Sequence, residues 1–252
     1  KELLDSALVG ADAVVHLAAL GSVPRSVKDP VSTFQTNAIG TLNLLEACRK
    51  VGCNRVIFAS SSSVYGSNEE LPKREYQWLS PKSPYAASKL AAESLVTSYR
   101  STFGMTNTSF RFFNVYGPRQ DPSSPYAAVI PRLISAVKSE ENFQVFGDGK
   151  QSRDFTFVGD VAKILVSQVL EPRSDLPLVN LAFGGSTSIL DLIEISEDVL
   201  NREIALDFMP SRVGDVKASQ NSPELIMNSV GAFEPTPIRQ GLEITFKSHG
   251  LL

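Results

Sequence analysis

The sequence predicts an α/β fold with a parallel sheet, because short apolar segments alternate with amphipathic helical segments along much of the chain. The expected strands of this sheet are short and apolar, and they span residues 13–19, 55–60, 108–113 and 178–181. The expected helices separate those strands, and they span residues 30–50, 84–103, 126–139 and 160–170. We therefore expect a Rossmann-like parallel sheet with helices packed on both of its faces.

Proline and glycine become frequent after residue 115, where the regular alternation of strands and helices ends. Further strands are expected over 142–146 and 204–208, and a further helix over 188–200. This change predicts two parts. Residues 1–115 would form a partial nucleotide-binding core, and residues 116–252 a smaller, mainly C-terminal lobe that is interleaved with the core sheet near 150–185.

The beginning of the chain lacks a feature that a complete nucleotide-binding sheet has. Residues 1–10 resemble the tail of a helix, and the strand over 13–19 follows without a glycine-rich turn from strand to helix. We therefore expect a sheet without its N-terminal strands, as in a fragment of a longer protein or in a genuinely truncated product.

Composition excludes several functional classes. The chain has 252 residues, of which 42% are hydrophobic and 20% charged, as in ordinary globular domains. A net charge of −3 argues against a nucleic-acid surface, and no apolar run approaches the ~20 residues of a membrane helix. Cys48 and Cys53 lie outside any CxxC motif, and His16 and His249 are too few for a metal site. We expect a cytoplasmic protein without a metal.

Tyr85 and Lys89 are the most informative pair, because residues four apart lie on one face of a helix. A lysine ammonium beside a phenol favours the ionised phenol. An unperturbed tyrosine titrates near pH ~10, so its pKa must fall by about 3 units for it to act as a base near neutrality. One charge about 4 Å away at an effective dielectric of about 20 supplies roughly 4 kcal/mol, which is enough. The pair therefore predicts a tyrosine general base.

Polar residues follow two of the expected strands, at the points where these strands end. The serine run 60–63 follows the strand over 55–60, and Asn114 follows the strand over 108–113. Ligands of open parallel sheets bind at the carboxyl ends of the strands. We therefore expect the serines, Asn114 and Tyr85 to form one site, in which a serine hydroxyl shares a substrate oxygen with the phenol.

At these residues the sequence resembles the extended short-chain dehydrogenase/reductase superfamily and, within it, the NAD-dependent epimerase/dehydratase family. The resemblance extends over residues 1–252, and its motifs are His16-Leu17-Ala18-Ala19, Ser60 to Gly66, Tyr85-x-x-x-Lys89, Arg111 to Pro118, Ser152-Arg153-Asp154-Phe155 and Arg212-x-Gly214-Asp215. Within the family, the chain is most similar to UDP-N-acetylglucosamine 4-epimerases of the bacterial surface-polysaccharide type. The segments that carry this closer similarity are Gly21 to Ser26, Arg119 to Pro122 and Tyr126 to Pro131.

The resemblance implies NAD as cofactor, a UDP-sugar as substrate and a transient 4-keto intermediate. The implied catalytic residues are Ser61, Tyr85 and Lys89, with Lys89 lowering the pKa of Tyr85 and binding the nicotinamide ribose. The implied NAD contacts are Leu17, Ala18, Ala19, Thr36, Tyr85, Lys89 and Phe113. The family's GxxGxxG turn, which seats the NAD pyrophosphate on a helix N-terminus, is not in this sequence, so we expect the chain to bind NAD weakly.

The resemblance also implies how the UDP-sugar is held. Asn114, Arg153 and Arg212 would contact the diphosphate, and Asp215 a ribose hydroxyl, while the uracil would pack on residues 144–146. The full set of implied substrate residues is Gly21, Ser22, Arg25, Ser61, Ser62, Ser63, Asn114, Gln120, Ala128, Val129, Gln144, Val145, Phe146, Arg153, Arg212, Asp215 and Ser219. A surface ion pair with Asp148 or Asp154 is the alternative for Arg153.

Two features narrow the implied reaction. The serine run carries no carboxylate, whereas the family's dehydratases and decarboxylases have one there, so 4-epimerisation is favoured. Ser219 stands where epimerases restricted to UDP-glucose have a bulky tyrosine, which favours an N-acetylated sugar (UDP-GlcNAc/UDP-GalNAc). A UDP-glucose or UDP-glucuronate epimerase remains an alternative, as does an inactive sugar-nucleotide-binding fragment. By family analogy we expect a homodimer through the helices over 30–50 and 84–103.

Overall fold

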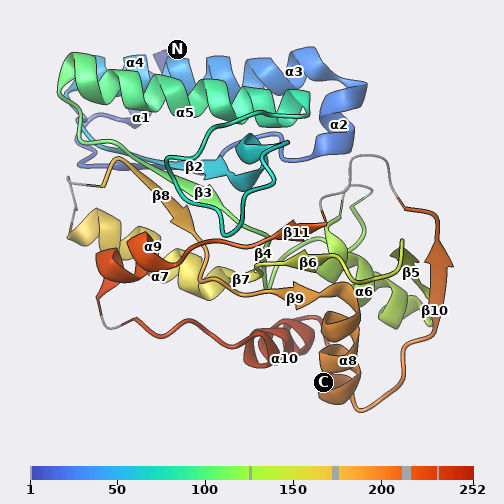
Figure 1. Ribbon diagram of the computed structural model, residues 1–252. Helices are drawn as coiled ribbons and strands as arrows, with labels where there is room; N and C mark the ends of the chain where they lie inside the picture. Colours follow the sequence, from blue (N-terminus) through green and yellow to red (C-terminus); the bar gives the residue numbers. More distant parts are fainter. Residues whose placement is uncertain (1, 125–126, 172–175, 212–216, 232) are drawn as a thin grey trace.

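The computed structural model describes residues 2–124, 127–171, 176–211, 217–231 and 233–252 (Figure 1). Its main sheet is parallel and has the strand order β1-β2-β3-β8. The four strands are β1 (Val14–His16), β2 (Val56–Ser61), β3 (Thr108–Phe112) and β8 (Leu178–Leu181). This confirms the predicted Rossmann-like α/β fold, with the first strand shorter than the expected 13–19.

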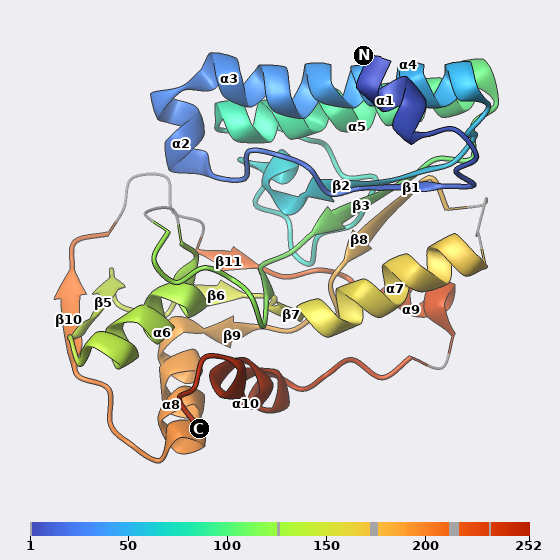
Figure 2. The same ribbon diagram turned by 180° about the vertical axis from the view of Figure 1, so that it is seen from behind.

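Helices cover both faces of this sheet. One face carries α1 (Glu2–Ala7), α4 (Gly40–Val51) and α5 (Pro84–Phe103), and the opposite face carries α7 (Val158–Leu170) and α9 (Glu224–Val230) (Figures 1 and 2). Alternate residues of β2 therefore enter different clusters. Val56 and Phe58 pack with the helices α4 and α5, whereas Ile57 packs with α7. Because both faces are covered, every residue of β2 is buried.

The helical run before β2 is less regular than expected. It comprises α2 (Val23–Lys28), α3 (Pro30–Phe34), a π-helical turn η1 (Gln35–Ile39) and then α4. In the π-turn, Asn37 is bound to the backbone of Leu20 in both directions: its Oδ1 accepts from the Leu20 N–H at 2.7 Å, and its Nδ2 donates to the Leu20 carbonyl. The turn thus fixes the segment that leaves the carboxyl end of β1.

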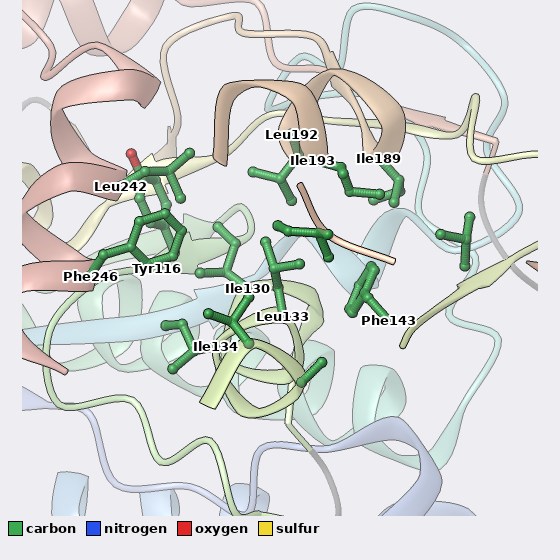
Figure 3. Packing of buried hydrophobic residues seen from close by; sticks show 14 residues of the cluster. Tyr116, Ile130, Leu133, Ile134, Phe143, Ile189, Leu192, Ile193, Leu242 and Phe246 are labelled. Atoms are coloured by element: carbon green, nitrogen blue, oxygen red, sulfur yellow. The ribbon is translucent and has the colours of Figure 1, made fainter. Parts of the chain in front are cut away.

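The C-terminal lobe has its own apolar core (Figure 3). Its helices are α6 (Val129–Ser139), α8 (Ile189–Leu200) and α10 (Ile238–Ser248), and a parallel pair of strands, β5 (Phe143–Phe146) and β10 (Leu206–Met209), lies beside them. Leu133 of α6, Leu192 of α8 and Leu242 of α10 meet in this core with 0% exposure. The expected helix over 126–139 begins at Val129, and α7 begins two residues before the expected residue 160.

Short strands connect the lobe to the sheet. Strands β11 (Ala218–Ser219), β6 (Ser152–Arg153) and β9 (Thr187–Ser188) form one small sheet, and β4 (Val115–Tyr116) pairs with β7 (Thr156–Phe157). The chain then returns to the main sheet through α7 and β8. No helix within the described ranges is both long enough and apolar enough to span a membrane.

Candidate active site

The predicted rim of polar residues lies at the carboxyl end of the main sheet. Ser61 ends β2 and is 9% exposed, and the following Ser62–Tyr65 form a 3-10 turn, η2. Asn114 follows β3 in a left-handed conformation, with φ of 35°. Tyr85 is the second residue of α5, whose N-cap Ser83 accepts a hydrogen bond from the Ala86 N–H at 3.1 Å. The structure thus brings the serine run, Asn114 and the start of α5 to one edge, as expected.

Ser61 and Tyr85 form the central hydroxyl pair. The Oγ of Ser61 accepts from the Ser63 N–H at 3.2 Å and from the Ser63 hydroxyl at 2.9 Å. With its lone pairs engaged by Ser63, Ser61 has its own proton left to donate. Tyr85 lies beside Ser61, and hydrogen bonding between the two side chains opposes the rise that burial causes in the pKa of the phenol. Ser63 therefore orients Ser61, a role that the sequence did not reveal.

Ser60 is the one member of the run that is committed elsewhere. Its hydroxyl donates to Oε2 of Glu93 at 2.6 Å, inside the contact between α5 and the sheet. Arg111 binds the same carboxylate in bidentate fashion, with Nε at 3.0 Å and Nη2 at 2.6 Å. Arg111 also donates to the Tyr65 hydroxyl at 2.8 Å, and Tyr65 in turn donates to Asn180. This buried network fixes the position of α5, and so of Tyr85, relative to strands β2, β3 and β8.

The predicted effect of Lys89 on Tyr85 differs from what the structure shows. We expected a lowered pKa for Tyr85, but burial raises the pKa of this phenol, and only the hydrogen bond from Ser61 opposes the rise. Lys89 donates to the carbonyl of Ala59 at 2.8 Å and lies over the ring of Phe58. Burial lowers the pKa of Lys89 to about 8. The ammonium is thus held by the backbone of β2, and it is not among the causes that shift the pKa of Tyr85.

His16 lies at the end of β1 and is neutral. Burial, and secondarily the charge of Lys89, lower its pKa to about 4. Its Nε2 lies 3.0 Å from the Thr41 hydroxyl, which itself donates to the Asn37 carbonyl at 2.6 Å. Nε2 must therefore carry the proton and donate it to Thr41. The imidazole adds no charge to the site and ties β1 to α4.

The residues expected to contact NAD lie on the same rim. Leu17 is 55% exposed and Ala18 is also exposed, directly after β1, so both present apolar surface at the carboxyl end of this strand. Ala19 is half-buried, and Thr36 is exposed in the π-turn. Phe113 is fully buried against Tyr65 and also lines a cavity. Their contact with NAD stays a prediction.

A cavity of about 230 Å³ lies between α6 and β5 and is termed here the uridine cavity, after the prediction that the uracil packs on residues 144–146. It gathers eight of the predicted substrate residues, namely Asn114, Gln120, Ala128, Val129, Gln144, Val145, Phe146 and Arg153. Gln120 donates through Nε2 to the Val115 carbonyl at 2.9 Å, and its buried Oε1 has no partner among the described residues. Arg132, which was not predicted from the sequence, also lines this cavity, and its guanidinium lies 5.1 Å from the Phe146 ring centre.

A second cavity of about 590 Å³ lies between η2, α2, the start of α5 and β11, and is termed here the sugar cavity, after the predicted substrate residues of the serine run and Ser219 that line it. Five predicted substrate residues line it, namely Ser62, Ser63, Asn114, Arg153 and Ser219. Asn114 and Arg153 line both cavities, so the two are adjacent and share a polar wall. Two lysines that were not predicted from the sequence, Lys73 and Lys82, also line the sugar cavity.

The remaining predicted substrate residues have other positions. Gly21, Ser22 and Arg25 line neither cavity. Ser22 is the N-cap of α2, and its Oγ accepts from the Arg25 N–H at 3.1 Å. Arg212 and Asp215 lie outside the described residues.

Comparison with known proteins identifies the family. The model described as the NAD dependent epimerase/dehydratase family matches residues 1–182. A Bacillus subtilis protein named uncharacterized UDP-glucose epimerase YtcB is 36% identical, over 84% of this chain and 66% of that protein. A putative UDP-glucose 4-epimerase of Methanocaldococcus jannaschii is 38% identical, over 73% of this chain and 59% of that protein. The chain therefore spans less than two thirds of the length of either relative.

Solved structures share the fold over almost the whole chain. A UDP-N-acetylglucosamine 4-epimerase from Methanobrevibacter ruminantium, in complex with UDP-N-acetylmuramic acid, is 39% identical with a TM-score of 0.92, covering 98% of this chain and 79% of that one. A UDP-glucuronic acid 4-epimerase from Bacillus cereus, in complex with UDP-glucuronic acid and NAD, is 30% identical with a TM-score of 0.89, covering 99% and 79%. Together with the rim geometry, these matches show that the chain belongs to the NAD-dependent epimerase/dehydratase family.

Proposed function

We propose that this protein is an NAD-dependent UDP-sugar 4-epimerase that interconverts UDP-GlcNAc and UDP-GalNAc. The observation that carries the proposal is the pair of adjacent cavities that share Asn114 and Arg153, with the Ser61–Tyr85 hydroxyl pair at the same rim. The uridine cavity combines apolar walls with polar side chains, among them Gln120 and Gln144, which could orient a nucleoside by hydrogen bonds. Arg153 stands between the cavities, where its planar fork suits the diphosphate that joins uridine to sugar.

The chemistry starts from a C–H bond at the sugar 4-position that is not acidic. NAD, when bound, supplies a hydride acceptor and a positive charge beside the phenol. The residues that would hold its nicotinamide end are Leu17, Ala18, Ala19, Thr36, Lys89 and Phe113. Tyr85, as phenolate, takes the proton of the sugar 4-hydroxyl. The Ser61 hydroxyl donates a hydrogen bond to the same sugar oxygen. Because burial raises the pKa of Tyr85, the base form depends on positive charge close to the ring.

The reaction class follows from what surrounds the sugar. Eliminating water from the sugar, or removing its carboxylate, needs additional acid–base groups beside the 4-keto intermediate. No carboxylate is found among the described residues that line the sugar cavity. In their absence the 4-keto sugar could only be reduced again, with the hydride returned to C4 by the cofactor and the proton returned to the sugar oxygen by Tyr85. Return of the hydride to the opposite face of C4 would invert the 4-position. This favours an epimerase over a dehydratase or a decarboxylase.

Ser219 supports an N-acetylated sugar. It is half-buried, lines the sugar cavity and pairs in register with Arg153 between strands β11 and β6. Its small side chain leaves room for a bulky 2-substituent beside the proposed position of the diphosphate. UDP-glucose and UDP-glucuronate are the alternative substrates, since both occur in the names of similar proteins.

We further propose a cytoplasmic homodimer. The helices α3 and α5 carry exposed apolar side chains, among them Val31 at 64%, Phe34 at 42% and Phe103 at 49% exposure. Covering these side chains with a second copy of the helices would remove apolar surface from water. Analytical ultracentrifugation of the protein tests this point, with a purely monomeric species as the contrary result.

The function is tested by incubating the protein with NAD and, separately, with UDP-GlcNAc, UDP-glucose and UDP-glucuronate. Proton NMR of the anomeric region distinguishes each 4-epimer from its parent. We expect the highest kcat/KM for UDP-GlcNAc with UDP-GalNAc as product. Faster turnover of UDP-glucose would contradict the substrate, and binding of all three without turnover would indicate the inactive sugar-nucleotide-binding alternative.

A further inference from the structure

One buried carboxyl lies at the junction of the segments that line the two cavities. Asp154 directly follows the strand β6 and is 1% exposed. The small sheet that contains β6 lies between the main sheet and the lobe (Figure 1). Asp154 itself lines neither cavity. Any effect of this residue on a bound substrate must therefore pass through the residues that it holds.

The backbone of Asp154 is bonded to two residues that line the cavities. Its N–H donates to the carbonyl of Ser219 at 2.8 Å, and its carbonyl accepts from Nδ2 of Asn114 at 3.2 Å. Ser219 lines the sugar cavity, whereas Asn114 lines both cavities. Arg153, the residue directly before Asp154, also lines both. The position of this one peptide segment thus sets the spacing between three of the predicted substrate residues.

The carboxyl group of Asp154 attaches the same segment to two other parts of the chain. Its Oδ2 accepts from the N–H of Gly184 at 2.9 Å and from the N–H of Asn221 at 3.0 Å. Gly184 lies shortly after β8 of the main sheet, and Asn221 lies two residues after Ser219 at the end of β11. The carboxyl therefore joins β6 to the carboxyl end of the main sheet and to the strand that carries Ser219.

Both of these bonds use the same carboxyl oxygen. The other oxygen, Oδ1, has no hydrogen-bond partner among the described residues. Burial raises the pKa of Asp154 to about 6, and the backbone N–H groups of Asn221 and Gly184 oppose that rise. A carboxyl buried with one oxygen unpartnered is costly in free energy. A neutral side chain of the same shape, with a single acceptor oxygen, could hold the two N–H groups equally well.

We propose that Asp154 is a positioning residue for the substrate, whose carboxyl sets the relative placement of the diphosphate-facing and sugar-facing residues around β6. The inference rests on the proposed UDP-sugar function and deepens it. Arg153 and Ser219 pair in register between β6 and β11, so displacing the segment moves both. The proposed base Tyr85 lies on α5, to which Asp154 makes no hydrogen bond among the described residues. Loss of the carboxyl should therefore weaken substrate binding and leave proton transfer at Tyr85 intact.

The test measures the dissociation constant of UDP by isothermal titration calorimetry and, separately, KM and kcat for UDP-GlcNAc. We expect Asp154→Ala to raise the dissociation constant of UDP and KM about tenfold, with kcat within about threefold of the parent protein. Asp154→Ser should do the same, because its hydroxyl is too short to reach both N–H groups, and it keeps the test open if the alanine variant does not fold. Asp154→Asn should restore both values to within about threefold, because its amide oxygen can replace Oδ2.

Asp160→Ala is the matched control. Asp160 is also 1% exposed, and its carboxyl accepts from the N–H of Thr236 at 2.7 Å and from the Thr236 hydroxyl at 2.9 Å. It lies on α7 and lines neither cavity. Asp160→Ala should therefore lower the free energy of unfolding in urea without changing the affinity for UDP.

Unchanged UDP affinity in a folded Asp154→Ala or Asp154→Ser protein would overturn the inference. An Asp154→Asn protein that binds UDP as weakly as the alanine variant would also overturn it, as would equal weakening by Asp160→Ala. The calorimetric result does not depend on turnover. UDP binding by the parent protein without epimerisation of any UDP-sugar would overturn the epimerase proposal alone, and absence of UDP binding by the parent protein would overturn both.

Discussion

The two sides of the site are stabilised in different ways. The catalytic side, at the rim of the main sheet, depends on buried polar contacts among Ser60, Glu93 and Arg111. The uridine side depends on an apolar cluster in which α6, α8 and α10 meet (Figure 3). A buried polar network fixes the positions of its atoms, but removal of one member leaves its partners without hydrogen bonds. An apolar core instead loses stability in proportion to the atoms removed. Catalytic geometry and nucleotide affinity should therefore be separable by mutation.

The largest effect is expected from Arg111→Met. It leaves the buried carboxylate of Glu93 without its cation, and breaking such a pair costs about 3–5 kcal/mol in the free energy of unfolding. Arg74→Met is the matched control, since the Arg74–Glu224 pair is exposed on both sides and should contribute little to the free energy of unfolding. Urea denaturation measures both. Similar losses for the two variants would show that the network does not hold α5.

Leu133→Ala should come next and act on the lobe. Leu133 has 0% exposure in the α6 core, and truncating a buried leucine costs about 2–5 kcal/mol. Because the helix α6 forms a wall of the uridine cavity, we expect weaker binding of UDP in calorimetry together with the lost stability. Leu170→Ala removes the same atoms from a side chain that is 74% exposed and should change neither quantity measurably. A stability loss without any change in UDP affinity would uncouple the lobe core from the cavity.

The buried carboxyl of Asp154 should make the free energy of unfolding depend on pH. It is 1% exposed, and its Oδ2 accepts from the N–H groups of Gly184 at 2.9 Å and Asn221 at 3.0 Å. Burial raises its pKa from 3.8 to about 6. The folded state then holds a proton that the unfolded state loses, so stability falls as pH rises between about 4 and 6, by up to about 3 kcal/mol.

The contribution of Asp154 is isolated by comparing the protein with Asp154→Asn. Urea denaturation across pH 4 to 7 should show the fall in the protein and a smaller fall in the variant. Parallel pH profiles for the two would contradict the raised pKa of Asp154.

The sequence predicted the features that depend on local spacing. The bounds of α5, the i, i+4 pair Tyr85/Lys89 and the place of Ser61 at the end of a strand all follow from short-range pattern. The helix α10 was not predicted, although its sequence carries a helical pattern in which the apolar residues Ile238, Leu242 and Phe246 recur every four positions.

Other features could not be read from spacing, because they depend on contacts between distant segments or with the backbone. The bond from Lys89 to the Ala59 carbonyl is one, since sequence patterns carry no information on backbone acceptors. The Glu93–Arg111 pair joins a helix to a strand. Lys73 and Lys82 come from a segment without regular periodicity, so only the folded chain places them in the sugar cavity.

The most direct test of the central claim compares Tyr85→Phe with Tyr76→Phe. Tyr76 is 81% exposed and lines neither cavity, so both variants lose one phenolic oxygen but only one loses the proposed base. We expect Tyr85→Phe to lower kcat for UDP-GlcNAc epimerisation by at least about 100-fold, as for loss of a general base, with UDP-sugar affinity within about threefold of the parent protein. Tyr76→Phe should keep full activity. Epimerisation at the parent rate by Tyr85→Phe would contradict the account.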